Sequence, residues 1–110
     1  ILEAPEQAYP YAEHLGRAYQ IINFVRDYDE DIERGYHYIG EDHNRYLDMF
    51  EASLFFGERG IKYLPRKVRK PIRYANEMYR WCAKKLRKGH KNPKPNALVR
   101  MWIKLKVTLW

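Results

Sequence analysis

Apolar residues recur along most of the chain with the period of an α-helix rather than with the alternation of a β-strand. The first such segment begins near Tyr11, and its spacing predicts one helix to Arg34, which we expect to be the longest. Gly35 directly after it is a typical helix cap. The residues that form the apolar side of this helix are Leu15, Ala18, Tyr19, Ile22 and Val25.

Three further helices are predicted downstream. The second is marked by Leu47, Phe50 and Leu54 and fades near Gly57 and Gly60. The third carries the clearest apolar stripe: Ile72, Ala75, Met78, Tyr79, Cys82 and Leu86. The last is opened by Leu98, Met101, Trp102 and Leu105, although a short strand over 103–110 is a minor alternative.

The connecting segments contain residues that interrupt helices. Residues 1–10 have two prolines and are expected to be an irregular lead-in, and 36–45 and 88–96 are expected to be loops. A break is expected at 63–65, where Pro65 lies. The pattern as a whole predicts an all-α protein, with residues 1–110 as a single helical domain.

Charge is divided unevenly between the two parts of the chain. Residues 1–60 contain 13 Asp and Glu and 5 Lys and Arg, whereas residues 61–110 contain 16 Lys and Arg and one acid, Glu77. The net charge of the 110 residues is +7. An acidic part suits a cation, and a basic part suits phosphate, nucleic acid or a lipid surface.

Composition excludes several other classes of protein. No apolar run approaches the roughly 20 residues that a membrane-spanning helix needs, and the chain does not start with a secretory signal. The single cysteine, Cys82, excludes an internal disulfide framework and is expected in the core. These features favour a reducing, cytoplasmic setting. Because the chain begins at Ile1, it is expected to be a processed product or a fragment.

A row of polar residues lies beside the apolar side of the first helix. At 100° per residue its members fall on one stripe: Gln20, Asn23, Asp27 and Asp31. Two carboxylates four residues apart repel each other mildly, so a bound cation would explain them. Mg²⁺ or Mn²⁺ suits such hard oxygen ligands, and Arg26 and Arg34 are placed to contact phosphate oxygens. The alternative is a solvated acidic surface, because pairs of aspartates at this spacing often occur by chance.

The same segment resembles a known family. Residues 15–27 (LGRAYQIINFVRD), followed by Glu30-Asp31, Arg34-Gly35 and Tyr38, are similar to the second aspartate-rich motif of the squalene/phytoene synthase family. Tyr36 stands where that family has Arg, and Gly40 where it has Pro. A weaker, collinear likeness continues through Tyr63-Leu64-Pro65, Arg69, Ile72, Ala75 and Tyr79.

The resemblance implies an isoprenoid (terpenoid) synthase-like helical bundle, of which this chain would be the C-terminal part. It implies a prenyltransferase that joins two prenyl diphosphates, farnesyl or geranylgeranyl, head to head. Asp27 and Asp31 would be the catalytic residues and the Mg²⁺ ligands. The substrate-binding residues would be Gln20, Asn23, Arg26, Arg34 and Tyr79. NADPH would be needed only by a squalene-forming member, and the first aspartate-rich motif would come from a missing N-terminal half or a partner chain.

Two alternatives to this enzyme remain open. One is a non-catalytic relative that acts as a binding or assembly factor. The other is a basic module that binds a lipid surface or nucleic acid, carried by the cluster Lys84, Lys85, Arg87, Lys88, Lys91 and Lys94 with Trp81 and Trp102 nearby. Of these two partners, the resemblance ranks a peripheral membrane surface above nucleic acid.

Overall fold

The computed structural model describes residues 6–109, and its regular structure there is entirely helical. A short 3₁₀ turn, η1 (Glu6–Ala8), leads into α1 (Tyr9–Arg26), α2 (Tyr28–Glu33) and α3 (His43–Glu58). A second turn, η2 (Ile61–Tyr63), precedes α4 (Arg66–Arg87) and α5 (Ala97–Thr108). The all-α prediction is confirmed, and the strand considered near the C-terminus is replaced by α5.

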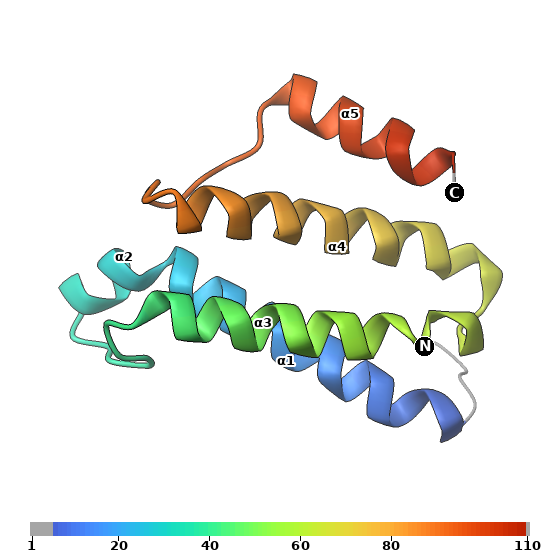
Figure 1. The fold of residues 1–110 in the computed structure, drawn as a ribbon, viewed down its shortest axis with the longest axis horizontal. Helices are drawn as coiled ribbons and strands as arrows, with labels where there is room; N and C mark the ends of the chain where they lie inside the picture. The colour runs from blue at the N-terminus through green and yellow to red at the C-terminus, as the bar shows by residue number, and fades with distance from the viewer. Residues whose placement is uncertain (1–5, 110) are drawn as a thin grey trace.

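The helices are stacked in layers (Figure 1). α1 and α3 pack against each other, α4 lies across this pair, and α5 lies on the far side of α4. The core cluster is formed mainly by α1 and α3, with a contribution from α4: Leu15, Ala18, Ile21, Ile22, Val25, Leu47, Phe50, Leu54, Cys82 and Ala83. The apolar stripes predicted for these helices therefore face one another.

The first predicted helix is broken at Asp27, which has φ −95° and ψ 10°. Asp favours helix ends over helix interiors, and the run of acids that follows adds like-charge repulsion. α2 ends as expected at Gly35, where φ is 83° and the N–H groups of Gly35 and Tyr36 bond to Ile32 and Asp31. Gly35 is therefore the glycine of a Schellman motif.

The longest helix is α4, with 22 residues against 18 for α1, so the expectation that the first helix is longest is wrong. α4 begins at Arg66 and contains Pro71, where the sequence suggested a start near Ile72. Pro71 lies in the second turn of α4, where its missing N–H removes the helical hydrogen bond to the carbonyl oxygen of Lys67, and the helix continues through it.

Pro10, in contrast, lies in the first turn of α1, where no helical hydrogen bond is lost. The part of the predicted lead-in from Glu6 onward is helical. Residues 1–5 of that lead-in lie outside the described residues.

α3 begins at His43, within the segment 36–45 that was expected to be a loop, and the loop expected over 88–96 agrees with the structure. The break at 63–65 separates η2 from α4, and it is fixed by Arg69, which donates to the carbonyl oxygens of Leu64 at 2.9 Å and Lys62 at 2.8 Å. Asn96 caps α5 by accepting the N–H of Val99 at 2.9 Å. Within residues 6–109, no helix is long and apolar enough to cross a membrane.

Candidate functional site

Asp27 lies at the junction of α1 and α2 and is held by its neighbour. Arg26 Nε donates to Asp27 Oδ1 at 2.9 Å, and Arg26 Nη2 donates to Asp27 Oδ2 at 3.2 Å. This paired contact raises the pKa of Arg26 above its ordinary value, against the opposing effect of partial burial. About a third of each side chain remains exposed, so the carboxylate is fixed in place and accessible.

Asp31 follows Asp27 by one helical turn. The Asp31 N–H donates to the Asp27 carbonyl oxygen at 2.9 Å, so helical spacing continues across the break between α1 and α2. At that spacing the two Cβ atoms are about 5–6 Å apart. Asp29, in contrast, is exposed and pairs with Lys91 at 3.4 Å. The structure therefore separates Asp29 from the other two aspartates, as the helical geometry predicts.

A pocket of about 440 Å³ lies beside Asp27. One side of it is formed by the junction of α1 and α2, and the other by the 92–95 loop and the first turn of α5. Its lining residues are Arg26, Asp27, Glu30, Asn92, Pro93, Lys94, Pro95 and Arg100. Within residues 6–109, neither Lys94 nor Arg100 has an acidic partner, so their charges are available to a ligand.

We call this space the Asp27 pocket. It combines carboxylates with unpaired cations, which is the combination that binds a metal-chelated phosphate. Lys94 and Arg100 are more than 60 residues from Asp27 in the sequence. Lys94 is part of the basic cluster noted in the sequence, but Arg100 carries no local signal, since only the position of α5 brings it to the pocket.

The other predicted site residues, including Asp31, are not in the lining of this pocket. Gln20 and Arg34 are exposed, and Tyr79 stacks on Tyr19 with ring centroids 5.0 Å apart. Asn23 is half-buried, and its Oδ1 is fully buried without a hydrogen-bond partner.

Asp27 and Asp31 could take part in holding a magnesium ion of the kind that binds together with its substrate. In residues 6–109 no three His, Cys, Asp or Glu side chains converge as a metal cage would require. Mg²⁺ commonly takes one or two carboxylates and fills its remaining positions with water and substrate phosphate. Asp27 and Asp31, one helical turn apart, could supply two carboxylates of that kind.

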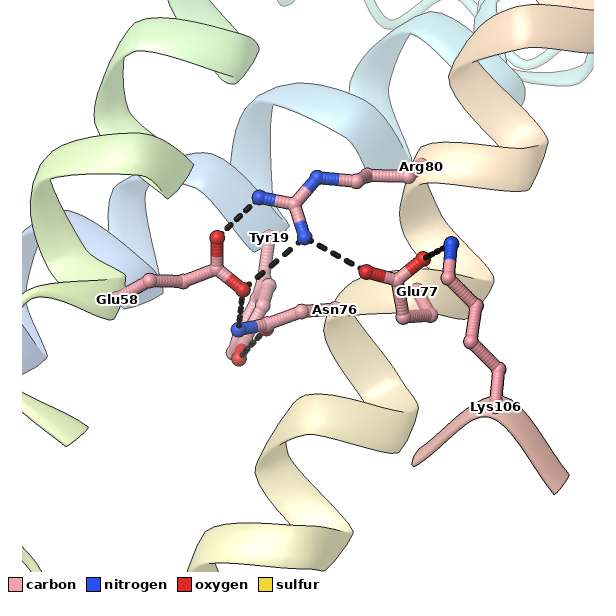
Figure 2. A network of polar contacts seen from close by, with 6 residues as sticks. All are labelled: Tyr19, Glu58, Asn76, Glu77, Arg80 and Lys106. Carbon is pink, nitrogen blue, oxygen red and sulfur yellow. Dashed lines mark hydrogen bonds and ion pairs between the residues drawn. The ribbon is translucent and has the colours of Figure 1, made fainter. Parts of the chain in front are cut away.

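A second polar cluster ties four helices together (Figure 2). Asn76 of α4 is fully buried; its Oδ1 accepts from Tyr19 of α1, and its Nδ2 donates to Glu58 of α3 at 3.0 Å. Arg80 joins Glu58 to Glu77, and Glu77 accepts from Lys106 of α5 at 3.1 Å. The only trace of this cluster in the sequence is Glu77, the single acid after residue 60.

Cys82 is close to the candidate site but has a structural role. It is 6% exposed within the core cluster, as expected. Burial raises the pKa of the Cys82 thiol to about 11, with Arg26 opposing the shift and Asp27 adding to it. A thiol with this pKa stays protonated near neutral pH and is a poor nucleophile or metal ligand.

Comparison with known proteins identifies the family of the first part of the chain. The sequence model of squalene/phytoene synthases matches residues 1–58, which include α1, the acidic α2 and α3. The chain thus has the helical fold of a prenyltransferase-type protein. It belongs to the squalene/phytoene synthase family, whose fold is the all-α terpenoid synthase type.

The match ends at residue 58, and so the weaker likeness noted over 63–79 stays a prediction. No individual curated protein and no solved structure matches the chain significantly.

Proposed function

We propose that this chain provides the second metal-binding helix of a prenyltransferase that condenses two prenyl diphosphates head to head. The observation that carries the proposal is the placement of Asp27 in the lining of a pocket that also contains the unpaired Lys94 and Arg100. Asp31 follows Asp27 by one helical turn. The substrates are farnesyl or geranylgeranyl diphosphate, and NADPH takes part only if the product is squalene.

In this proposal the acidic residues bind the metal and the basic residues bind the diphosphate. Asp27 and Asp31 hold Mg²⁺ or Mn²⁺, and Arg26 keeps the Asp27 carboxylate oriented. Asn23 remains a candidate for substrate binding. Lys94 and Arg100 contact the diphosphate oxygens from the opposite side of the pocket. Bound Mg²⁺ supplies electrostatic stabilisation of the departing diphosphate. Gln20, Arg34 and Tyr79 remain candidates for contacts with more distant parts of the substrate.

A first aspartate-rich helix is needed to complete this site. We propose that a segment outside these 110 residues, or a partner chain, supplies it and faces α1. The expectation that the chain alone does not turn over substrate follows from this, because one pair of aspartates binds only part of the metal cluster.

Asp27→Asn and Asp31→Asn test the metal assignment. Each keeps the size of the side chain and removes its charge, so we expect Mg²⁺-dependent binding of inorganic diphosphate to weaken at least about tenfold. Titration calorimetry of the chain measures this directly. Asp29→Asn is the matched control, since Asp29 is exposed and pairs with Lys91. Equal effects of all three variants, or none, would refute the metal assignment.

Arg100→Met separates the diphosphate contact from the metal contact. We expect weaker binding of inorganic diphosphate with unchanged binding of Mg²⁺ alone, because the positively charged side chain of Arg100 is not a metal ligand. Lys67→Met, at an exposed position in the first turn of α4, is the control for net charge. When the complementing half is supplied, the same variants are assayed for Mg²⁺-dependent release of diphosphate from the prenyl substrate.

A non-catalytic relative is the second candidate, and one pair of observations favours it. Asp27 is already engaged on both carboxylate oxygens by Arg26, and Tyr36 replaces the arginine of the family motif. Such a protein would keep the helical fold as a binding or assembly factor. It would show no Mg²⁺-dependent diphosphate binding in the calorimetric experiment.

A further inference from the structure

The Asp27 pocket has two walls, and they belong to different parts of the helical stack. Asp27 lies at the junction of α1 and α2, whereas Arg100 lies in the first turn of α5. α5 packs on α4, and α4 packs in turn on α1 and α3 (Figure 1). The position of Arg100 relative to Asp27 therefore depends on how α5 is held on α4.

The rotation of α5 about its own axis decides where Arg100 points. Ile103 and Val107 are 1% and 3% exposed, on the side of α5 that packs on α4. Arg100 precedes them by three and seven residues, so helical geometry places it on the same side, at the N-terminal end of the helix. A rotation by the 100° of a single residue would turn its guanidinium group away from the Asp27 pocket.

A half-buried ion pair fixes this rotation. Lys106 lies at the border of the same side of α5, about 60° around the helix from Ile103, and its Nζ donates to Glu77 Oε2 of α4 at 3.1 Å. Glu77 is 8% exposed and is the only acid in residues 61–110. Apolar contacts have no preferred direction, whereas a charge-assisted hydrogen bond holds its two side chains in one geometry.

The same carboxylate is connected to α1 through a series of polar contacts (Figure 2). Glu77 accepts from Arg80 at 3.0 Å, and Arg80 also donates to Glu58 at 3.0 Å. Glu58 accepts from Asn76, which accepts in turn from Tyr19 of α1. Partly buried polar networks of this kind make the packing of the helices that they join more rigid. One continuous set of contacts therefore joins the helix that leads to Asp27 with the helix that carries Arg100.

We infer that Glu77 and Lys106 are positioning residues of the Asp27 pocket, because their ion pair sets the rotation of α5 and holds Arg100 opposite Asp27. Neither residue lines the pocket, so both act through Arg100 rather than by contact with a ligand. The inference rests on the proposed function, in which Arg100 contacts the diphosphate.

The test measures binding of inorganic diphosphate to the whole chain in the presence of Mg²⁺, by titration calorimetry. We expect Glu77→Gln and Lys106→Met each to weaken this binding about fivefold. Binding of Mg²⁺ alone should stay unchanged, because neither substitution alters α1 or α2. Circular dichroism should show unchanged helix content in both variants.

Two control variants separate the ion pair from the charge of α5. Lys104→Met removes the same charge but no ion pair, since Lys104 has no acidic partner in residues 6–109. Lys106→Arg keeps a cation that reaches Glu77. Both variants should bind diphosphate as the unmodified chain does.

The decisive comparison adds Glu77→Gln to Arg100→Met. If Glu77 acts by placing Arg100, it should change diphosphate binding less than about twofold once Arg100 is removed. A further loss of about fivefold would show that Glu77 supports the fold in general, and would overturn the inference. Full diphosphate binding by both Glu77→Gln and Lys106→Met would overturn it as well.

Failure of the proposed function itself gives a different result. Arg100→Met and Asp27→Asn would then leave diphosphate binding unchanged, and the positioning role of Glu77 would be refuted together with the site. Weaker binding in Arg100→Met but not in Glu77→Gln or Lys106→Met would refute the positioning role alone.

Discussion

At the scale of single residues, Tyr19 and Asn76 illustrate what local sequence does not reveal. Tyr19 belongs to the apolar stripe of α1, yet its hydroxyl donates to the side-chain amide oxygen (Oδ1) of Asn76, a buried residue of α4. Burial, helped by Tyr79 and Glu58, raises the pKa of Tyr19 to about 12. The hydroxyl is therefore part of the packing between α1 and α4.

We expect Tyr19→Phe to lower the free energy of unfolding by about 1–3 kcal/mol, since it leaves the buried amide oxygen of the Asn76 side chain without a donor. Tyr79→Phe is the control, because the Tyr79 hydroxyl has no hydrogen-bond partner in the described part of the chain. Urea denaturation of both variants measures the difference. Losses of equal size would contradict the role given to the Tyr19 hydroxyl.

The contribution of the Tyr19 hydroxyl to the stability of the fold should decrease as the pH rises. In the unfolded chain Tyr19 loses its proton near its ordinary pKa of 10.0, whereas the folded protein holds it to about pH 12. Folding therefore binds a proton between these values, and stability falls as pH rises through them. The advantage of the unmodified chain over Tyr19→Phe should be complete below pH 10 and shrink above it.

At the scale of elements, the approach of α1 to α3 depends on Gly57. A Cβ added at Gly57 would lie 2.7 Å from the Leu15 side chain and 2.9 Å from the Leu15 backbone nitrogen. A side chain tip can move aside, but a backbone nitrogen moves only with its helix. The sequence suggested that the second helix fades at this glycine, whereas α3 continues through it to Glu58.

Gly57→Ala should therefore destabilise the protein by about 1–3 kcal/mol, as overpacking does. Gly16→Ala is the matched control, at a glycine inside α1. Nothing lies within 4 Å of the added Cβ, so this change should stabilise the protein by about 0.5–1 kcal/mol. Thermal unfolding of the two variants tests both signs. A neutral Gly57→Ala would show that α1 and α3 are packed less closely than the structure has them.

Helix ends show a similar division between sequence and structure. The Schellman motif at Gly35 and the break before α4 are local events, and local residues predicted both. The interruption at Asp27 and the helical turn that contains Pro71 went against the local pattern. At Asp27 the preference of Asp for helix ends and the repulsion among the following acids interrupt the helix, whereas at Pro71 the helix continues despite the loss of one backbone hydrogen bond.

At the scale of the whole molecule, the two oppositely charged parts of the sequence meet. Several ion pairs join residues 1–60 to residues 61–110: Glu58 with Arg80, Asp48 and Glu51 with Arg87, and Asp29 with Lys91. Part of the charge division therefore serves contact between helices, above all between α3 and α4. Lys94 and Arg100, which have no acidic partner in residues 6–109, lie at the Asp27 pocket.

The attachment of α5 depends on Glu77. This carboxylate, 8% exposed, accepts from Lys106 of α5 and from Arg80 of its own helix. Glu77→Gln should weaken that attachment by about 1 kcal/mol, so amide hydrogens of α5 should exchange roughly fivefold faster. Amides of α1 and α3 should exchange at unchanged rates, because their contacts lie elsewhere.

Lys104→Met is the control for this prediction, since Lys104 has no ionic partner in residues 6–109. Mass spectrometry with peptide-level resolution separates α5 from the other helices. Uniformly faster exchange throughout the chain would mean that Glu77 supports the whole bundle rather than the attachment of α5.

The sequence by itself determined the helical class, most helix positions and the family, because apolar periodicity and the motif around Asp27 are local patterns. It also placed Asp27 and Asp31 on one side of a helix, since i,i+4 spacing fixes that geometry. Only the tertiary structure brought Lys94 and Arg100 to Asp27 and buried Asn76 between three helices. These features depend on how the helices pack, and packing joins residues whose separation in the sequence carries no periodic signal.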